Sequence, residues 1–161
     1  SPCLLTNVNM ASMTEADLIP IICAMLLGGE AELRLPYSLN DSAHYVRVDC
    51  VTDTHAIEIG LDDRRSSLDS LQQALFYGAL LDRAPMVILI DTDGREDPTE
   101  FQVETAARAT GVAYRVIDLD FLIRLQITAP FRSSHIENDL LSNYTSKRQN
   151  PILKNFSKRK L

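Results

Sequence analysis

Residues 44–60 read HYVRVDCVTDTHAIEIG, and this stretch decides the fold. Apolar and polar residues alternate in its first part, up to Cys50, which is typical of a strand with one buried face. A polar turn follows, and the alternation resumes over residues 55–59. We therefore expect two neighbouring strands, with Asp49 and Glu58 facing the same way if the strands form a hairpin.

The flanking sequence predicts the other elements of an α/β domain. Thr14 with an acid three residues later fits a helix start, and Asp97-Pro98 fits another. The expected elements are a helix from 14 to 27, a strand over 30–36, a loop over 37–42, a helix over 68–80, a buried strand over 86–90, a helix over 98–110 and a strand over 113–117. The last strand, helix and strand predict a parallel βαβ unit.

Polar residues interrupt this apolar pattern in a particular order. The segments that carry them are Glu32-Leu33-Arg34-Leu35-Pro36, Arg47-Val48-Asp49-Cys50, Thr54-His55-Ala56-Ile57-Glu58 and the helical pair Gln73 and Tyr77. This order resembles the PD-(D/E)XK nuclease superfamily, in the branch that has a Gln-x-x-x-Tyr helix, and is similar to bacterial members of that branch. The resemblance implies a three-layer α/β/α domain with a mixed central sheet, of the restriction-endonuclease-like type.

The resemblance also implies a site for Mg²⁺ or Mn²⁺. Asp49 and Glu58 would supply hard oxygen ligands, and the backbone carbonyl of Ile59 would complete the set. The expected catalytic residues are Glu32, Asp49, Glu58, Gln73 and Tyr77. Without the family, the same acids would be ordinary solvent-facing residues of an antiparallel hairpin.

One part of the family pattern is missing. The third motif of the family is Glu-x-Lys, whereas this chain has Glu58-Ile59-Gly60. Only arginines can replace the lysine in this part of the chain, and an arginine stabilises phosphate without acting as a base. The candidates are Arg34, Arg47, Arg64 and Arg65. If Gly60 is the only defect, we expect Gly60→Lys to create or raise cleavage.

Two functions therefore follow from the sequence. The first is a metal-dependent nuclease-like domain that hydrolyses phosphodiesters, with activity weakened or lost at Gly60. The alternative is a non-catalytic module on the same scaffold that binds nucleic acid or protein. Neither function involves a membrane, because the longest apolar run, residues 18–27, is too short to span one. The sequence does not indicate an oligomeric state.

Charge divides the chain. Residues 1–131 carry 9 Arg, no Lys and 20 acidic residues, a formal charge of −11, whereas residues 132–161 carry a formal charge of +5. We expect residues 1–13 to be a leader or remnant, residues 14–131 to form the nuclease-like domain, and residues 132–161 to be a basic, flexible tail that can attract polyanions.

The three cysteines are Cys3, Cys23 and Cys50. An odd number at irregular spacing fits neither a disulfide framework nor a zinc site. A disulfide between Cys23 and Cys50 is one alternative. Two buried thiols in a reducing compartment are the favoured interpretation. The expected location is therefore cytoplasmic.

Overall fold

A five-stranded mixed sheet forms the centre of the protein. The computed structural model describes residues 13–131, so the expected leader, apart from Met13, and the expected basic tail lie outside the described residues. The strands are β1 (Glu30–Leu39), β2 (Ser42–Val51), β3 (His55–Leu61), β4 (Ala84–Asp91) and β5 (Ala113–Asp118), and they lie in chain order across the sheet. β2 pairs antiparallel with both β1 and β3, whereas β3, β4 and β5 are parallel to one another.

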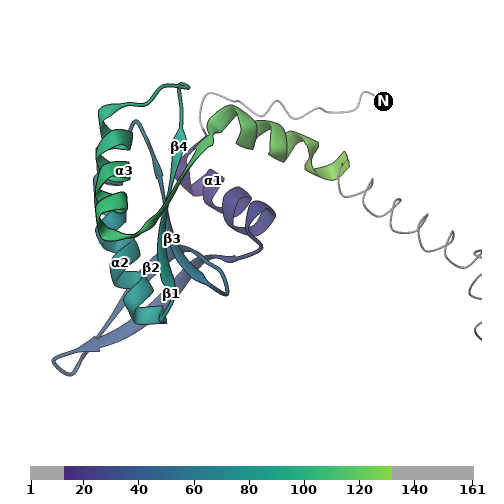
Figure 1. Ribbon diagram of the computed structural model, residues 1–161. Coiled ribbons are helices and arrows are strands. Elements are labelled where there is room, and N and C mark those ends of the chain that lie inside the picture. The colour runs from purple at the N-terminus through teal and green to yellow at the C-terminus, as the bar shows by residue number, and fades with distance from the viewer. Residues whose placement is uncertain (1–12, 132–161) are drawn as a thin grey trace, which may run out of the picture. The chain divides into compact units, whose positions relative to one another are not determined.

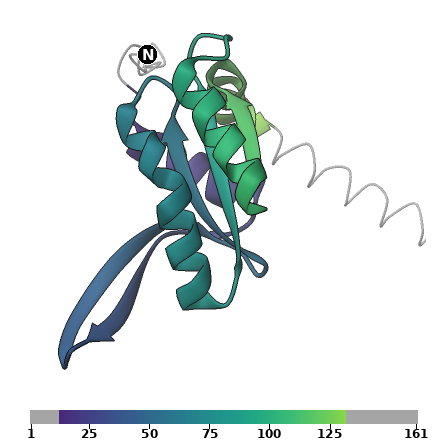
Figure 2. The same cartoon turned by 60° about the vertical axis from the view of Figure 1, so that its left-hand side comes forward.

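Helices cover both faces of this sheet, as Figures 1 and 2 show. One face carries α1 (Glu15–Pro20) and the π-helical segment η2 (Ile21–Leu26). The other carries α2 (Ser70–Leu81), which follows the short 3₁₀ helix η3 (Arg65–Asp69), and α3 (Pro98–Thr110). The expected α/β architecture is thus confirmed.

The core explains why β3 and β4 lie at the centre. Every residue of β3 after His55 is buried, as expected for a parallel strand covered on both faces. Val87 and Leu89 of β4 pack with Val103 and Ala107 of α3 in one apolar cluster. Alternation along β4 therefore assigns its odd-numbered residues to the face that α2 and α3 cover.

The hairpin of β1 and β2 differs from the expectation. The predicted loop over residues 37–42 is wrong, because both strands continue to a two-residue turn. Asn40 and Asp41 form that turn with φ of 50° and 61°, the left-handed conformation that tight hairpins require. Pro36 is tolerated within β1 because this strand lies at the sheet edge, where one side of the backbone needs no partner. The hairpin extends beyond the rest of the sheet (Figure 2).

The first helix begins as expected but changes form after Pro20. Thr14 and Asp17 form the predicted capping box. After the proline the chain adopts π-helical turns, and the Leu27 N–H donates to the carbonyl of Ile22. The predicted α-helix is therefore correct up to Pro20 and wrong beyond it, where the helix is of the π type.

A disulfide joins this segment to the sheet. Cys23 of η2 is bonded to Cys50 of β2, with 5.4 Å between the Cα atoms, and both residues are fully buried. The favoured interpretation of two free thiols is therefore wrong. Residues 27 positions apart gave no local signal for the bond, because it depends on how η2 packs on the sheet.

The βαβ unit of β4, α3 and β5 is confirmed. Asp97 caps α3 by accepting a hydrogen bond from the Glu100 N–H at 2.8 Å, and Gly111 ends the helix with φ of 72°.

Residues 119–131 are helical, and those from 123 onward belong to a second compact unit. Over residues 13–131 no helix has the length and the hydrophobicity that a membrane span requires.

Candidate functional site

Asp49 of β2 and Glu58 of β3 lie side by side on two neighbouring strands. The β2–β3 register pairs Cys50 with Ile57, which brings the preceding residue of β2 beside the following residue of β3. The Ile59 N–H donates to Asp49 Oδ2 at 2.9 Å, and the Asp49 N–H contacts Glu58 Oε1 at 3.5 Å. The two acids are only 8% and 5% exposed, so they are not the solvent-facing residues of an ordinary hairpin.

Burial changes the ionisation of this pair. Desolvation raises the pKa of both carboxyl groups, and the negative charge of Asp49 raises that of Glu58 further. The Ile59 N–H and a hydrogen bond from the Glu58 carboxyl partly offset the effect on Asp49. The pair therefore holds a proton near neutral pH, and a cation is a natural replacement for that proton.

Gln73 and Tyr77 reach the same place from α2. Both line a pocket of about 300 Å³ whose walls also include Asp49 and Glu58. Tyr77 is 7% exposed, and burial together with the two nearby carboxylates raises the pKa of its hydroxyl. Four of the five expected site residues thus come together.

Glu32 is the expected site residue that does not join the other four. It does not line the pocket, and it forms an ion pair with Arg47, with 3.5 Å between Oε1 and the guanidinium nitrogen. Its neighbours Ala31 and Leu33 pair with Cys50 and Val48, so it lies opposite Asp49 but with a left-handed φ of 55°. The charge of Glu32 raises the pKa of Asp49, although Glu32 does not line the pocket.

Glu15 is the acid that the sequence interpretation missed. It belongs to the first turn of α1 and lines the pocket with Asp49 and Glu58. Burial and the charge of Asp49 raise the pKa of its carboxyl. An acid in a first helical turn is usually explained by the helix dipole, so its position in the sequence did not reveal a role in the site.

Gly60 leaves no space for the missing lysine. A Cβ atom added there would lie 2.5 Å from Ser67 Oγ, 3.0 Å from Ser67 Cβ and 3.2 Å from Leu89 Cδ2. Ser67 is itself buried and donates from Oγ to the Leu61 carbonyl at 2.6 Å. This packing contradicts the premise that Gly60→Lys needs no other change.

The arginines expected to replace the lysine differ in position. Arg47 lines the pocket, and the charge of Arg64 acts on Glu15. Arg34 is engaged elsewhere, with its guanidinium carbon 3.6 Å from the centroid of the Tyr45 ring. Arg47 is therefore the pocket-lining cation nearest to the acid pair in sequence and in space.

The donor set fits a hard divalent cation. Asp49, Glu58, Glu15 and Ile59 line one polar pocket, and three of them are carboxylates. Mg²⁺ and Mn²⁺ prefer such ligands, and Mg²⁺ usually keeps several waters beside one or two carboxylates. Two buried acids side by side in this pocket are the observation that supports this fit.

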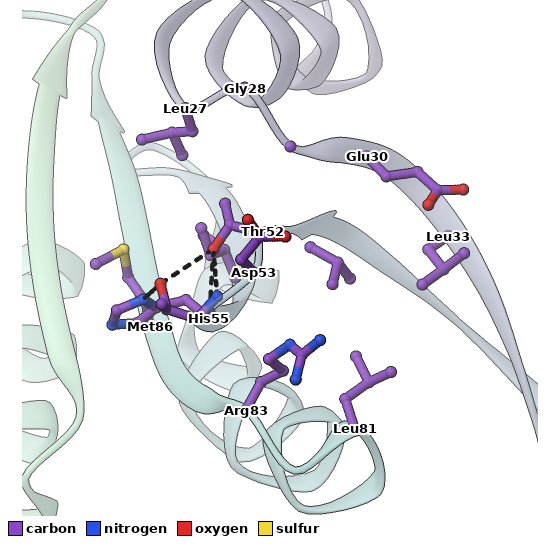
Figure 3. Close-up of a pocket in the computed structure, with 14 residues that line it drawn as sticks. Leu27, Gly28, Glu30, Leu33, Thr52, Asp53, His55, Leu81, Arg83 and Met86 are labelled. Atoms are coloured by element: carbon purple, nitrogen blue, oxygen red, sulfur yellow. Dashed lines mark hydrogen bonds between the residues drawn. The ribbon is translucent and has the colours of Figure 1, made fainter.

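A larger pocket of about 930 Å³ lies where the β2–β3 turn approaches the end of α2 (Figure 3). Its polar groups mostly bond one another: the backbone N–H groups of Thr54 and His55 donate to Thr52 Oγ1, and Thr54 Oγ1 is 2.8 Å from His55 Nδ1. Glu30 and Arg83 add opposite charges to the lining. This mixture of groups does not define a ligand class.

Comparisons with models of protein families, with curated proteins and with solved structures found no match to this chain.

Proposed function

We propose that this chain is a metal-dependent nuclease-like domain with a restriction-endonuclease-like fold, and that Asp49 and Glu58 hold Mg²⁺ or Mn²⁺. One observation supports the proposal most: two buried acids lie together in a polar pocket that a glutamine and a tyrosine also line. Burying two carboxylates side by side is costly without a cation, and this arrangement is typical of functional sites.

The surrounding residues have complementary roles in the proposal. Glu15 adds a third carboxylate, and Gln73 and Tyr77 offer hydrogen-bond donors toward the acids or a phosphate oxygen. Arg47 supplies positive charge at the pocket and remains protonated, so it binds phosphate but cannot accept a proton. A divalent cation, when bound, supplies positive charge to a phosphodiester and makes water more acidic.

The proposed activity is weak. The family pattern uses a lysine where this chain has Gly60, and every lysine of the sequence lies at or after Lys147. Without that ammonium group the pocket lacks a residue that orients water and offsets negative charge. The acids and the cation must then provide most of the rate enhancement.

The alternative is a non-catalytic module that binds nucleic acid or protein. The packing of Ser67 against Gly60 favours it, because the chain has filled the space of the lysine instead of leaving it open. Nucleic acid is the partner that the nuclease interpretation implies, whereas a protein partner belongs only to this alternative.

Calorimetric titration of Mg²⁺ and Mn²⁺, with cleavage assays on single- and double-stranded DNA and RNA, tests the proposal. We expect cation binding that Asp49→Asn abolishes, together with slow cleavage that requires the cation. Asp63→Asn is the matched control, because Asp63 is exposed and does not line the pocket. Cation binding without cleavage would favour the alternative. The absence of both cation binding and cleavage would overturn the metal site.

The cytoplasmic location stays a prediction. The buried Cys23–Cys50 disulfide is more typical of a non-reducing compartment, and it is the observation that a location experiment has to explain.

A further inference from the structure

The β1–β2 hairpin extends beyond the rest of the sheet and exposes one of its faces (Figure 2). Leu35 of β1 and Val46 of β2 pack on an apolar cluster of the core, so they belong to the opposite face. Because side chains alternate along a strand, Arg34, Tyr45 and Arg47 lie on the face that turns away from that cluster. All three are exposed, and together they form the hairpin surface.

Two arginines face each other on the hairpin surface. The register pairs Arg34 with Arg47, and like charges directly opposite on a sheet are destabilising. Arg47 forms an exposed ion pair with Glu32 at 3.5 Å, and such a pair contributes little in water. No ion pair among the described residues includes Arg34. A bound anion would therefore stabilise two charges that the fold alone compensates weakly.

Tyr45 adds an aromatic ring on which a base can stack. The guanidinium carbon of Arg34 lies 3.6 Å from the centroid of this ring, yet Tyr45 is still 62% exposed. Proteins bind single-stranded nucleic acids by stacking bases on exposed aromatic rings and guanidinium groups, beside basic side chains that contact the phosphates. A base inside a duplex is already stacked on its neighbours, so this surface fits an unpaired strand.

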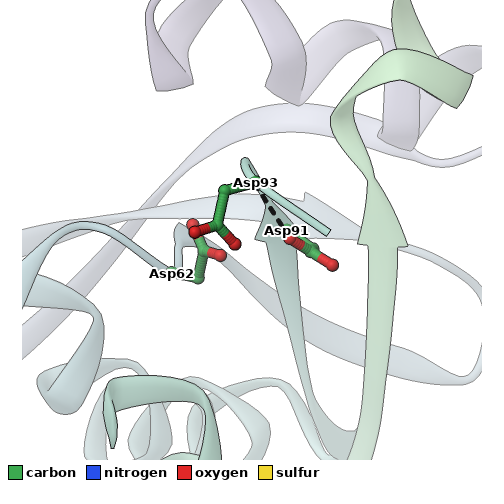
Figure 4. A group of neighbouring side chains, drawn as sticks. All are labelled: Asp62, Asp91 and Asp93. Carbon is green, nitrogen blue, oxygen red and sulfur yellow. Dashed lines mark hydrogen bonds between the residues drawn. The ribbon is translucent and has the colours of Figure 1, made fainter. Parts of the chain in front are cut away.

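The remainder of the domain is unfavourable for a polyanion, because residues 1–131 carry a formal charge of −11. At the carboxyl ends of β3 and β4, for example, one carboxylate oxygen from each of Asp62, Asp91 and Asp93 lies within 4.8 Å of the others (Figure 4). Asp62 and Asp91 accept hydrogen bonds from backbone N–H groups of the loop after β4, so this cluster assigns no ligand. An anionic strand is therefore attracted to the hairpin surface more than to its surroundings.

We propose that the hairpin surface binds a single-stranded segment of nucleic acid, with one base stacked on Tyr45 and with phosphates beside Arg34 and Arg47. Arg47 also lines the pocket of Asp49 and Glu58, so a strand held on the hairpin continues toward the acid pair. The inference rests on the proposed function in one respect, that the partner is nucleic acid. It requires neither a bound cation nor cleavage.

Binding of a fluorescently labelled oligothymidylate to the full chain, measured by anisotropy in EDTA, tests the stacking contact. Tyr45→Leu keeps a large apolar side chain but removes the ring, and it should weaken the affinity by about tenfold, the usual effect of losing one stacked base. Tyr45→Phe should keep the native affinity, because stacking needs the ring and not the hydroxyl. Phe101→Leu is the matched control, since Phe101 is 59% exposed and belongs to α3.

The salt dependence of the affinity tests the arginines. For a single strand, each phosphate contact contributes about 0.7 to the slope of log affinity against log salt. Arg34→Gln and Arg47→Gln should each reduce the slope by about this amount. Arg83→Gln is the matched control and should leave the slope unchanged, because Arg83 is exposed and precedes β4. Pairing the oligothymidylate with oligoadenylate should weaken binding, since the paired bases cannot stack on Tyr45.

An absence of oligonucleotide binding, or an affinity that Tyr45→Leu leaves unchanged, would overturn the inference. An equal loss of slope in Arg83→Gln would also overturn it, because binding would then depend on charge in general. These results leave the cation site untouched, since every measurement is made in EDTA. A chain that binds the strand through Tyr45 but neither binds Mg²⁺ nor cleaves would contradict the proposed metal site and support the inference.

Discussion

Ser67 fills the space beside Gly60, so that a Cβ atom added at residue 60 would lie 2.5 Å from the Ser67 hydroxyl. If the chain is the nuclease-like domain proposed above, the position of the expected lysine is therefore closed to a side chain. A serine from a different element, η3, has taken the volume that a side chain would need. Placing a lysine at residue 60 therefore requires that Ser67 change as well.

The first prediction follows from this contact. Gly60→Lys alone should lower stability by about 1–3 kcal/mol, the usual cost of overpacking, and should not raise cleavage. The double variant Gly60→Lys with Ser67→Gly should recover part of that stability and raise Mg²⁺-dependent cleavage. Urea unfolding and a cleavage assay measure the two effects.

Gly60→Ala separates packing from charge. It should destabilise the chain by itself and cost less when Ser67→Gly is also present, because the methyl group meets the same serine. Equal costs in both backgrounds would show that Ser67 does not exclude a side chain at residue 60.

The second prediction concerns the acid pair in the absence of metal. Asp49→Asn removes one of two crowded carboxylates, so the metal-free chain should keep its stability or gain some. The variant should also lose its response to Mg²⁺. Strong destabilisation by Asp49→Asn would instead assign Asp49 a structural role, as acceptor for the Ile59 N–H.

The third prediction concerns pH. Burial raises the folded-state pKa of Glu58 above its ordinary value of 4.5, so the folded chain binds a proton that the unfolded chain releases. The stability from this group is complete below pH 4.5 and is lost as the pH rises toward the folded-state pKa. Tm in EDTA should therefore fall across this range, and the fall should be smaller in Asp49→Asn. A saturating divalent cation should reverse it, and identical pH profiles in both chains would contradict the coupling.

The fourth prediction concerns the disulfide. Cys23 and Cys50 close a loop with a sequence separation of 27, and a cross-link of this size stabilises by about 3–4 kcal/mol in the chain-entropy model. Reduction, or replacement of both residues by serine, should lower the free energy of unfolding by a comparable amount. An unaltered stability on reduction would mean that the bond does not form in solution.

Local signals explain what the sequence predicted. Thr14 and Asp17, like Asp97, are helix caps whose partners lie within one turn, so their effect can be anticipated from spacing alone. The convergence of Asp49 and Glu58 follows from strand alternation across a short turn. Each of these features depends on fewer than a dozen consecutive residues.

What the sequence did not reveal depends on packing between distant segments. Glu15 reaches the pocket because α1 lies on the sheet, and Ser67 meets Gly60 because η3 folds back over β3. The Cys23–Cys50 bond has the same origin. No spacing rule connects these residues, since their proximity arises only when the layers assemble.

The last prediction distinguishes the two proposed functions. Arg47 is exposed and lines the pocket of the acid pair, whereas Arg34, on the neighbouring strand, stacks on Tyr45. If Arg47 offsets phosphate charge, Arg47→Gln should lower cation-dependent cleavage by about tenfold or more, the usual effect of losing one electrostatic stabiliser. At saturating nucleic acid, Arg34→Gln should leave cleavage unchanged. The cation affinity should not fall in Arg47→Gln, because that change removes a positive charge that acts on Asp49. If Arg47→Gln weakens nucleic-acid binding in a chain that never cleaves, the acid pocket serves binding, because the same guanidinium then contacts phosphate without a reaction to accelerate.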